Sequence, residues 1–281
     1  MIRPDLHMHT AASDGVLSVH ELARQVQRAD VTLFSVTDHD TVASLPAAFD
    51  AAYERGLAFI PGVEISTEGD EDIHILGYGV DPEDEALLSF LRQSDAMRLE
   101  RTRRAVRVLC DMGMPLDWDE LSAGAEATVG RLHIARALTA KGYVQNEGEA
   151  FSKYLGKGRP ACVPRETPAA SEAISLLRSR AAVPVLAHPG LIPWPQERLL
   201  PMLRRWIDAG LMGVEVYHPA NRQNYPLWDR IARQNGLLVT GGSDFHDFRG
   251  SHGRIGETAA EWPQACEDAW KLYRAAKKHR I

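Results

Sequence analysis

Residues 31–40 read Val-Thr-Leu-Phe-Ser-Val-Thr-Asp-His-Asp, an apolar and β-branched run that ends in two acidic residues and a histidine. A nearly continuous run of this kind is typical of a strand buried on both faces of a parallel sheet. With six similar runs, the sequence predicts seven strands, over 2–7, 31–37, 57–65, 73–79, 183–187, 213–217 and 237–241. Helix-like segments separate them, and this alternation indicates an α/β fold with parallel strands in a closed or nearly closed barrel.

The strand pattern stops between about 85 and 165, where amphipathic helical segments take over. Two of these segments are Arg98–Met112 and Arg131–Lys141. Prolines, which disfavour the continuation of a helix, mark both ends of the stretch. We therefore expect a barrel domain over 1–84 and 165–281, and an inserted helical subdomain over 85–164 that caps the substrate.

The composition limits the class of protein. With 281 residues, 44% of them hydrophobic, the chain can bury one large core. A net charge of -6 argues against a protein that coats nucleic acid by bulk electrostatics. Three distant cysteines without a CxxC pair suggest neither a disulfide framework nor a thiolate zinc site. No signal core or bilayer-long apolar run is present, so we expect a cytoplasmic protein without a membrane partner.

Histidines and acidic residues gather around the predicted strand ends. In Asp5-Leu-His-Met-His9 both imidazoles point to one face of an extended strand, although two ordinary histidines would explain this pair equally well. Five further segments place a His, Asp or Glu at or just past the C-terminal end of a predicted strand: Thr37–Asp40, Pro61–Glu64, Asp72–His74, Ala187–Gly190 and Gly242–His246. That end of an α/β barrel carries the chemistry. Imidazole and carboxylate ligands without thiolate suit Mn, Fe or Zn, and their number implies two or three ions.

These motifs, together with Asp5-Leu-His-Met-His-Thr-Ala-Ala-Ser-Asp-Gly15, resemble in this order the PHP family of metal-dependent phosphoesterases. The resemblance spans residues 5–246 and implies a distorted (β/α)7 barrel with a trinuclear metal site. It implies that a first ion is held by His7, His9, Glu64 and Asp244. It also implies a second ion held by Glu64, His74 and His188, and a third held by Asp14, His39 and His246. Beside His39, Asp38 and Asp40 are either acceptors for the free N–H of a ligand or parts of a solvated turn.

The ligand set points to hydrolysis of a phosphate ester. A hydroxide that bridges two cations is a nucleophile at neutral pH, and the cations neutralise the phosphoryl oxygens. Glu64 and Asp244 are therefore the expected catalytic carboxylates. His218, in Tyr217-His-Pro-Ala-Asn221, is expected to contact the substrate or supply a proton, with a capping role as the alternative. Asn221 is a further candidate substrate contact.

Basic residues in the helical insertion are candidates for binding a substrate phosphate, and solvated surface charges are the alternative reading. These candidates are Arg131, His133, Arg136, Lys157 and Arg159. The insertion resembles the PHP subfamily of 3',5'-nucleotide bisphosphate phosphatases and 5'-to-3' exoribonucleases. This resemblance implies removal of the 3'-phosphate from a nucleoside 3',5'-bisphosphate, with Mn as the first expectation for the metal.

Three alternatives stay open at this point. The first is 5'-to-3' exoribonuclease activity on short 5'-phosphorylated RNA, because diester and monoester hydrolysis can use the same metals. The second is histidinol phosphate phosphatase, whose substrate has no second phosphate for the basic insertion to bind. The third is a noncatalytic metal-binding PHP module. The oligomeric state and the metal's identity are not determined by the sequence.

Overall fold

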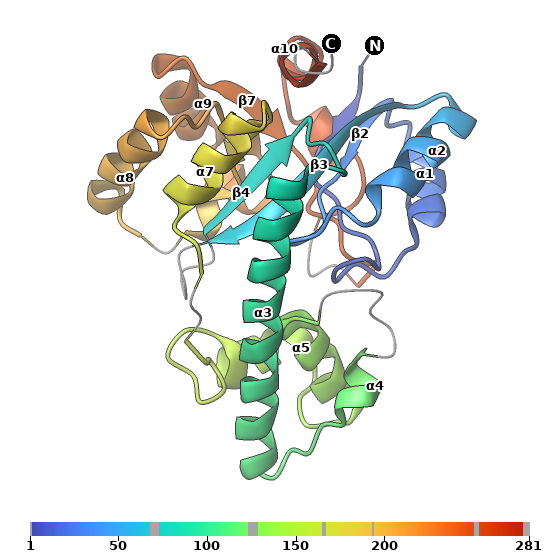
Figure 1. The fold of residues 1–281 in the computed structure, drawn as a ribbon, viewed down its shortest axis with the longest axis vertical. Coiled ribbons are helices and arrows are strands. Elements are labelled where there is room, and N and C mark those ends of the chain that lie inside the picture. The colour runs from blue at the N-terminus through green and yellow to red at the C-terminus, as the bar shows by residue number, and fades with distance from the viewer. Residues whose placement is uncertain are drawn as a thin grey trace.

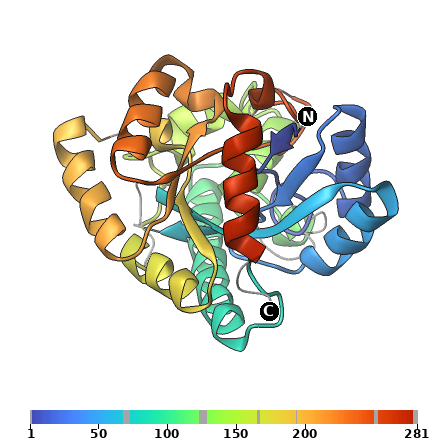
Figure 2. The same ribbon diagram turned by 90° about the horizontal axis from the view of Figure 1, so that it is seen from above.

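A computed structural model describes residues 2–67, 73–122, 129–164, 167–192, 194–249 and 253–277 of the chain. The seven predicted strands are present and form one sheet, in which they follow one another in chain order (Figure 1). They are β1 (Pro4–Asp5), β2 (Leu33–Val36), β3 (Ala58–Thr67), β4 (Ile73–Tyr78), β5 (Val183–Leu186), β6 (Gly213–Tyr217) and β7 (Leu238–Gly241). The fold is thus α/β, with a barrel-shaped sheet surrounded by helices (Figure 2).

The prediction that all strands run parallel is wrong for β4, which is antiparallel to both β3 and β5. Only residues 68–72 separate β3 from β4, whereas a parallel crossover needs a dozen or more residues. His74 therefore lies near the start of β4 and not, as expected, at its C-terminal end. Because β4 runs the opposite way, its start meets the C-terminal ends of its neighbours, and His74 still reaches the mouth of the barrel.

The sheet nearly closes on itself between the segments that follow β1 and β7. The Leu6 N–H donates to the Gly241 carbonyl at 3.2 Å, and the His9 N–H donates to the Phe245 carbonyl at 2.9 Å. In return, the Asp244 N–H donates to the His7 carbonyl at 2.8 Å. Backbone pairing thus continues past the ends of both strands. The paired segments contain three of the predicted metal ligands, His7, His9 and Asp244.

Helices cover the outside of the sheet. They are α1 (Val19–Arg28), α2 (Leu45–Arg55), α7 (Ala170–Ser179), α8 (Gln196–Asp208), α9 (Tyr225–Gln234) and α10 (Ala265–Lys277). The start of α1 illustrates the local rules, because the Ser18 side chain accepts from the Glu21 N–H and the buried face repeats at Val19, Leu22 and Val26. Helix α10 lies across the end of the barrel opposite the insertion (Figures 1 and 2).

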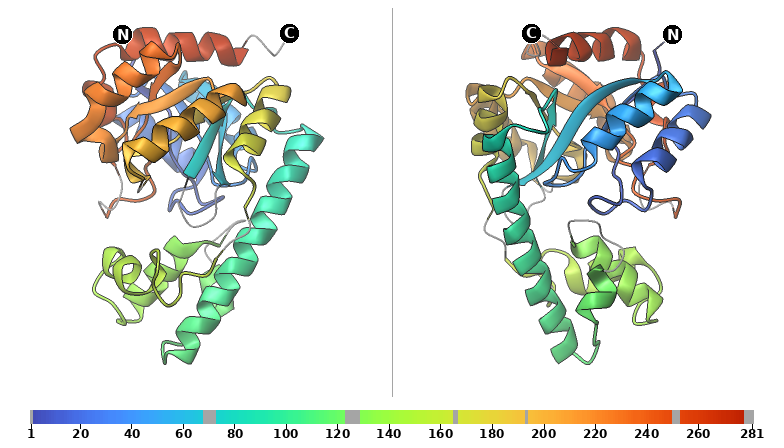
Figure 3. Two further views of the ribbon diagram at one scale, coloured as in Figure 1. Left: turned by 90° about the vertical axis from the view of Figure 1, so that its left-hand side faces the viewer. Right: turned by 45° about the vertical axis from the view of Figure 1, so that its right-hand side comes forward.

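The insertion consists of helices, as predicted. They are α3 (Glu85–Asp111), α4 (Trp118–Ser122), α5 (Arg131–Ala140), α6 (Glu147–Ala150) and the π-helix η2 (Phe151–Leu155). The helices expected over 98–112 and 131–141 are present, the first as part of the longer α3. This helix runs from the barrel wall into the insertion, which lies below the barrel mouth (Figure 3).

The two parts of the chain have separate hydrophobic clusters. Near its start, α3 adds Leu87 and Leu91 to the barrel core, whereas Ala105 and Leu109 near its end pack with α5 residues such as Ile134. On this basis we propose the division expected from the sequence. Residues 1–84 and 165–281 form the barrel domain, and residues 85–164 form the inserted subdomain. Residue 165, at the second boundary, lies outside the described residues. None of the helices described has the length and apolar character needed to span a membrane.

Candidate metal centre

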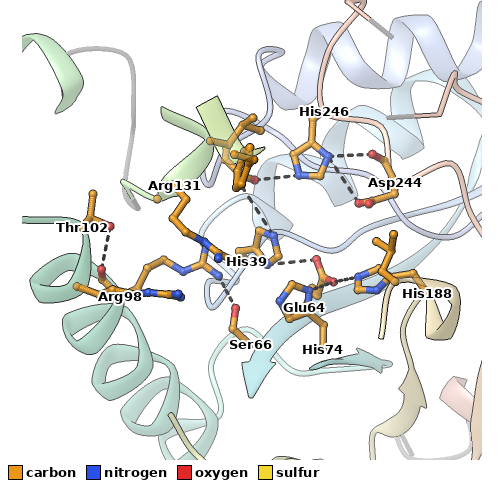
Figure 4. A pocket seen from close by; sticks show the side chains of 16 residues that line it. His39, Glu64, Ser66, His74, Arg98, Thr102, Arg131, His188, Asp244 and His246 are labelled. Carbon is orange, nitrogen blue, oxygen red and sulfur yellow. Dashed lines mark hydrogen bonds and ion pairs between the residues drawn. The ribbon is translucent and has the colours of Figure 1, made fainter. Parts of the chain in front are cut away.

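The buried carboxylate of Glu64, in β3, lies at the centre of five imidazoles. Figure 4 shows three of them, His39, His74 and His188, around it. Its Oε2 atom lies 3.2 Å from His7 Nε2, 3.1 Å from His9 Nε2 and 3.2 Å from His39 Nδ1. Its Oε1 atom lies 2.8 Å from His74 Nδ1 and 3.0 Å from His188 Nε2. One carboxylate oxygen thus faces each of two groups of rings, as expected of a ligand shared between two ions.

Two aspartates complete the arrangement. Asp244 Oδ1 lies 3.2 Å from both His7 Nε2 and His9 Nε2. Asp14 Oδ1 lies 3.2 Å from His246 Nε2, and its Oδ2 atom lies 3.8 Å from His39 Nε2. Among the described residues, four groups therefore have potential ligand atoms within 4.8 Å of one another: His7, His9, Glu64 and Asp244; His9, Asp14, His39 and His246; His39, Glu64 and His74; and His7, Glu215 and His218. The first is the set that the family resemblance implied for one ion, and the second adds His9 to the set implied for the third ion.

The donor atoms fit metal ions. Among the residues described, several buried ring nitrogens and a carboxylate oxygen have no hydrogen-bond partner: His7 Nε2, His9 Nε2, His39 Nδ1 and Glu64 Oε2. Buried polar atoms are normally paired, and unpaired ones are costly. Divalent cations take imidazole nitrogen and carboxylate oxygen as ligands, so ions between these atoms would satisfy them. The buried clusters suggest more than one metal ion.

The electrostatics of the centre keep its carboxylates ionised. Burial alone would raise the pKa of Asp14, but the His246 and His39 rings hold it well below its usual value. Burial alone would lower the pKa of His9, but Asp244 and Glu64 raise it to about 10. The metal-free centre therefore holds protons on imidazole that a cation has to displace.

Glu215, in the middle of β6, was not predicted. Its side chain is fully buried, and its Oε1 lies 3.0 Å from His7 Nδ1. Its Oε2 accepts the backbone N–H of His188 at 2.8 Å. Because His7 turns Nε2 toward the metal centre, its Nδ1 carries the proton and donates to Glu215. One carboxylate thus orients ligands from two strands. The signal in the sequence is an acidic residue inside the otherwise apolar Gly213–Tyr217 run.

Asp38 and Asp40 are both buried, which excludes the solvated turn. Asp38 accepts from the Thr10 N–H at 2.7 Å and from the Ser13 hydroxyl at 2.7 Å. It therefore fixes the loop that carries the predicted ligand Asp14. Asp40 accepts from Arg98 Nε at 3.1 Å, which anchors a basic side chain of the insertion at the barrel mouth.

A cavity of about 280 Å³ lies between the metal centre and the insertion. Its lining includes the candidate ligands Asp14, His39, Glu64, His74, His188, Asp244 and His246, and the arginines Arg98, Arg101 and Arg131. Arg98 and Arg101 come from α3, and Arg131 is the first residue of α5. Figure 4 shows Arg98 and Arg131 extending from the insertion toward the side of the pocket where the ligands lie. Arg98 and Arg101 were not predicted, although their i, i+3 spacing on a predicted helix is a signal.

Comparison with known proteins identifies the family. Residues 5–138 match the PHP domain. A 5'-3' exoribonuclease of Haemophilus influenzae is 34% identical over 246 residues, which cover 86% of this chain and 89% of the relative. The chain belongs to the PHP-domain phosphoesterases. A 3',5'-nucleoside bisphosphate phosphatase of Chromobacterium violaceum is 31% identical over 276 residues, 96% of each chain. An amidohydrolase structure from Chromobacterium violaceum with bound sulfate and no metal has a TM-score of 0.89 and 28% identity, and covers 97% of this chain and 96% of that one.

In this PHP phosphoesterase the predicted basic residues of the insertion have three kinds of surroundings. Arg131 lines the cavity of the metal centre. His133 Nδ1 accepts the Gly130 N–H at 3.1 Å, and Arg136 donates to the Asp14 carbonyl at 2.8 Å. Lys157 and Arg159 are exposed in the turn after η2 and are not part of the cavity's lining. The structure thus brings Arg131 to the candidate ligands and leaves Lys157 and Arg159 away from them.

The two predicted residues after β6 differ in their surroundings. His218 Nδ1 accepts the Ala220 N–H at 3.1 Å, which leaves the proton on Nε2, 3.4 Å from Asp244 Oδ2. Asn221 is fully buried, where Nδ2 donates to the Glu215 and Val216 carbonyls, and Oδ1 accepts from the Gly190 N–H. The Asn221 amide therefore joins the loop after β6 to β6 itself and to the segment after β5, while His218 faces the metal centre.

Proposed function

We propose that this PHP phosphoesterase removes the 3'-phosphate from nucleoside 3',5'-bisphosphates such as adenosine 3',5'-bisphosphate, leaving the 5'-monophosphate. The observation that carries the proposal is that Arg98, Arg101 and Arg131 line the same cavity as the candidate metal ligands. A substrate with two phosphates would place one at the metal centre and the other against the guanidinium groups. The relative named as a 3',5'-nucleoside bisphosphate phosphatase, which aligns along nearly the whole chain, supports this assignment.

Two or three divalent ions, with Mn as the first candidate and Fe or Zn as alternatives, would be held by the nine predicted ligands. They are His7, His9, Asp14, His39, Glu64, His74, His188, Asp244 and His246. When bound, such ions neutralise phosphoryl oxygens and lower the pKa of water. In this proposal Glu64 and Asp244 position the ligand rings around them, and Glu215 fixes the tautomer of His7.

The remaining residues orient the substrate and move a proton. The arginines of α3 and α5 hold the phosphate that does not react, so that the ester bond lies at the metal centre. His218 carries its proton on Nε2, beside Asp244, and donates it to the leaving 3' oxygen. No group of the protein needs to form a covalent bond with phosphorus in this scheme.

The second candidate is 5'-to-3' exoribonuclease activity, and the Haemophilus influenzae relative of that name favours it. The two activities differ in whether the 3'-phosphate carries further nucleotides. A cavity of about 280 Å³ is at the small end of ligand pockets, which favours a mononucleotide over a chain. We therefore place the phosphatase first.

A panel of substrates tests the assignment. Metal-reconstituted protein is incubated with adenosine 3',5'-bisphosphate, adenosine 5'-monophosphate, histidinol phosphate and a short 5'-phosphorylated RNA, with Asp244→Asn as control. We expect phosphate release from the bisphosphate and none in the variant. Nucleotide release from RNA at a comparable rate would make the protein an exoribonuclease, and preference for histidinol phosphate would revive that alternative. Inactivity on all substrates, with metal bound, would support a noncatalytic module.

A further inference from the structure

Arg136 of α5 connects the insertion to two segments of the barrel that carry candidate metal ligands. Its Nη1 donates to the backbone carbonyl of Asp14 at 2.8 Å. Its Nη2 donates to Asp247 Oδ2 at 2.9 Å, and Asp247 directly follows the ligand His246. Asp14 and His246 belong to the same potential ligand group. We propose that Arg136 is a positioning residue, which aligns this ligand group with the arginine side of the cavity, and not a substrate contact.

Two further residues extend the connection. Glu147 of α6 is buried, and its Oε1 lies 3.1 Å from Arg249 Nη1 and 3.6 Å from Arg136 Nε. The Asp247 carboxylate also accepts the Arg249 N–H, at 2.7 Å. Arg136, Glu147, Asp247 and Arg249 thus form a clasp of alternating charge between insertion and barrel. Both carboxylates are buried, so removal of the Arg136 guanidinium takes a positive charge away from each of them, which is costly.

The clasp determines where Arg131 lies. Arg131 and Arg136 are at the start and middle of the same ten-residue helix, α5. The helix moves as a rigid element, so fixing Arg136 against Asp14 also fixes the start of α5 at the cavity. Arg136 lines a different cavity, together with His133 and Arg249, and both of its Nη atoms already bind barrel acceptors. It therefore acts on the substrate through Arg131 and on the metal through Asp14.

A double-mutant cycle separates positioning from direct contact. It rests on the proposed function, because it uses KM for adenosine 3',5'-bisphosphate. We expect Arg136→Gln to raise KM about tenfold in the natural chain, but less than about twofold when Arg131→Gln is already present. Additive changes in KM would mean that Arg136 contacts the substrate itself, and would overturn the proposal.

Metal retention provides a readout that does not depend on the substrate. After Mn loading and dialysis, the Arg136→Gln variant should retain about one Mn ion per chain fewer than the natural protein, because the loop that carries Asp14 loses its support. Arg136→Lys, which keeps the charge but lacks the fork that reaches two acceptors, should lie between them. Lys153→Gln removes an exposed ion pair to Glu149 within the insertion and is the matched control. Unchanged metal content in a folded Arg136→Gln variant, checked by circular dichroism, would overturn the proposal even if the substrate were another phosphate ester.

Discussion

Glu215 lies 3.0 Å from Nδ1 of His7, and both side chains are fully buried. The same carboxylate accepts the backbone N–H of His188, so a residue that faces no substrate holds two candidate ligands in place. Glu215→Gln keeps the shape of the side chain but removes its charge. We expect metal affinity to fall about 10- to 100-fold, as for other residues that orient metal-binding histidines.

Competition with a metal-binding dye measures the metal affinity of the Glu215→Gln variant. Glu261→Gln is the control, because Glu261 pairs with Arg222 and Tyr225 at the surface and belongs to none of the potential ligand groups among the described residues. Equal metal affinity of Glu215→Gln and the natural protein would exclude the orienting role.

Arg101 should determine preference for a second phosphate. Arg101→Gln is expected to raise KM for adenosine 3',5'-bisphosphate about 30-fold, because a charged hydrogen bond contributes about 2 kcal/mol. Hydrolysis of a simple monoester such as p-nitrophenyl phosphate should change less than about twofold. Arg104→Gln, one turn further along α3 and exposed, is the control. Equal losses on both substrates would mean that Arg101 supports the structure and not the second phosphate.

Metal binding should release protons. Asp244 and Glu64 outweigh the effect of burial and raise the pKa of His9 to about 10, so near neutral pH the metal-free folded protein holds a proton there. A cation has to displace that proton, so metal affinity should rise with pH and weaken as the pH falls. Titration calorimetry in two buffers of different ionisation enthalpy measures the release, which we expect to be about one proton or more. Binding heats that do not depend on the buffer would contradict this reading of the centre.

The ion pair between Asp40 and Arg98 should stabilise the contact between barrel and insertion. The Arg98 Nη2 atom lies 2.9 Å from Asp40 Oδ2, and both side chains are largely buried. Asp40 has a φ of 52°, a conformation that Asn also adopts, so Asp40→Asn removes the charge without new backbone strain. We expect the free energy of unfolding to fall by about 3 kcal/mol.

Denaturant unfolding measures the Asp40 effect. The control is Glu54→Gln, whose exposed pair with Arg55 should contribute less than about 1 kcal/mol. A loss of similar size in the two variants would mean that burial does not strengthen the Asp40–Arg98 pair.

The sequence predicted the seven strands because each is a short apolar run, buried by the helices outside the sheet and by side chains inside the barrel. The direction of β4 could not be predicted from its own residues, because a hydrophobic pattern does not record direction. The short connection over 68–72 was the available signal. His74 was therefore expected at the barrel mouth for an incorrect reason: it lies beside Glu64 there because it is at the start of the antiparallel strand β4.

Side-chain direction explains what the sequence did not predict around the site. The basic residues of the insertion were selected by charge, and charge alone did not distinguish Arg131, in the cavity, from Lys157 and Arg159, which are exposed. Arg98 lay on a predicted helix, but its orientation depends on the buried partner Asp40, which is distant in sequence. Glu215 was hidden in a strand that otherwise reads as core. Contacts between distant segments decide all of these placements.

The most direct measurement is the ratio of kcat/KM for adenosine 3',5'-bisphosphate to that for a 5'-phosphorylated dinucleotide, with the Mn-loaded protein. We expect a ratio of about ten or more, with adenosine 5'-monophosphate and phosphate as the products of the first substrate, because the cavity is small and we propose that its arginines bind the second phosphate. A ratio below one, with nucleotides released from the 5' end, would contradict the phosphatase assignment and make the protein an exoribonuclease.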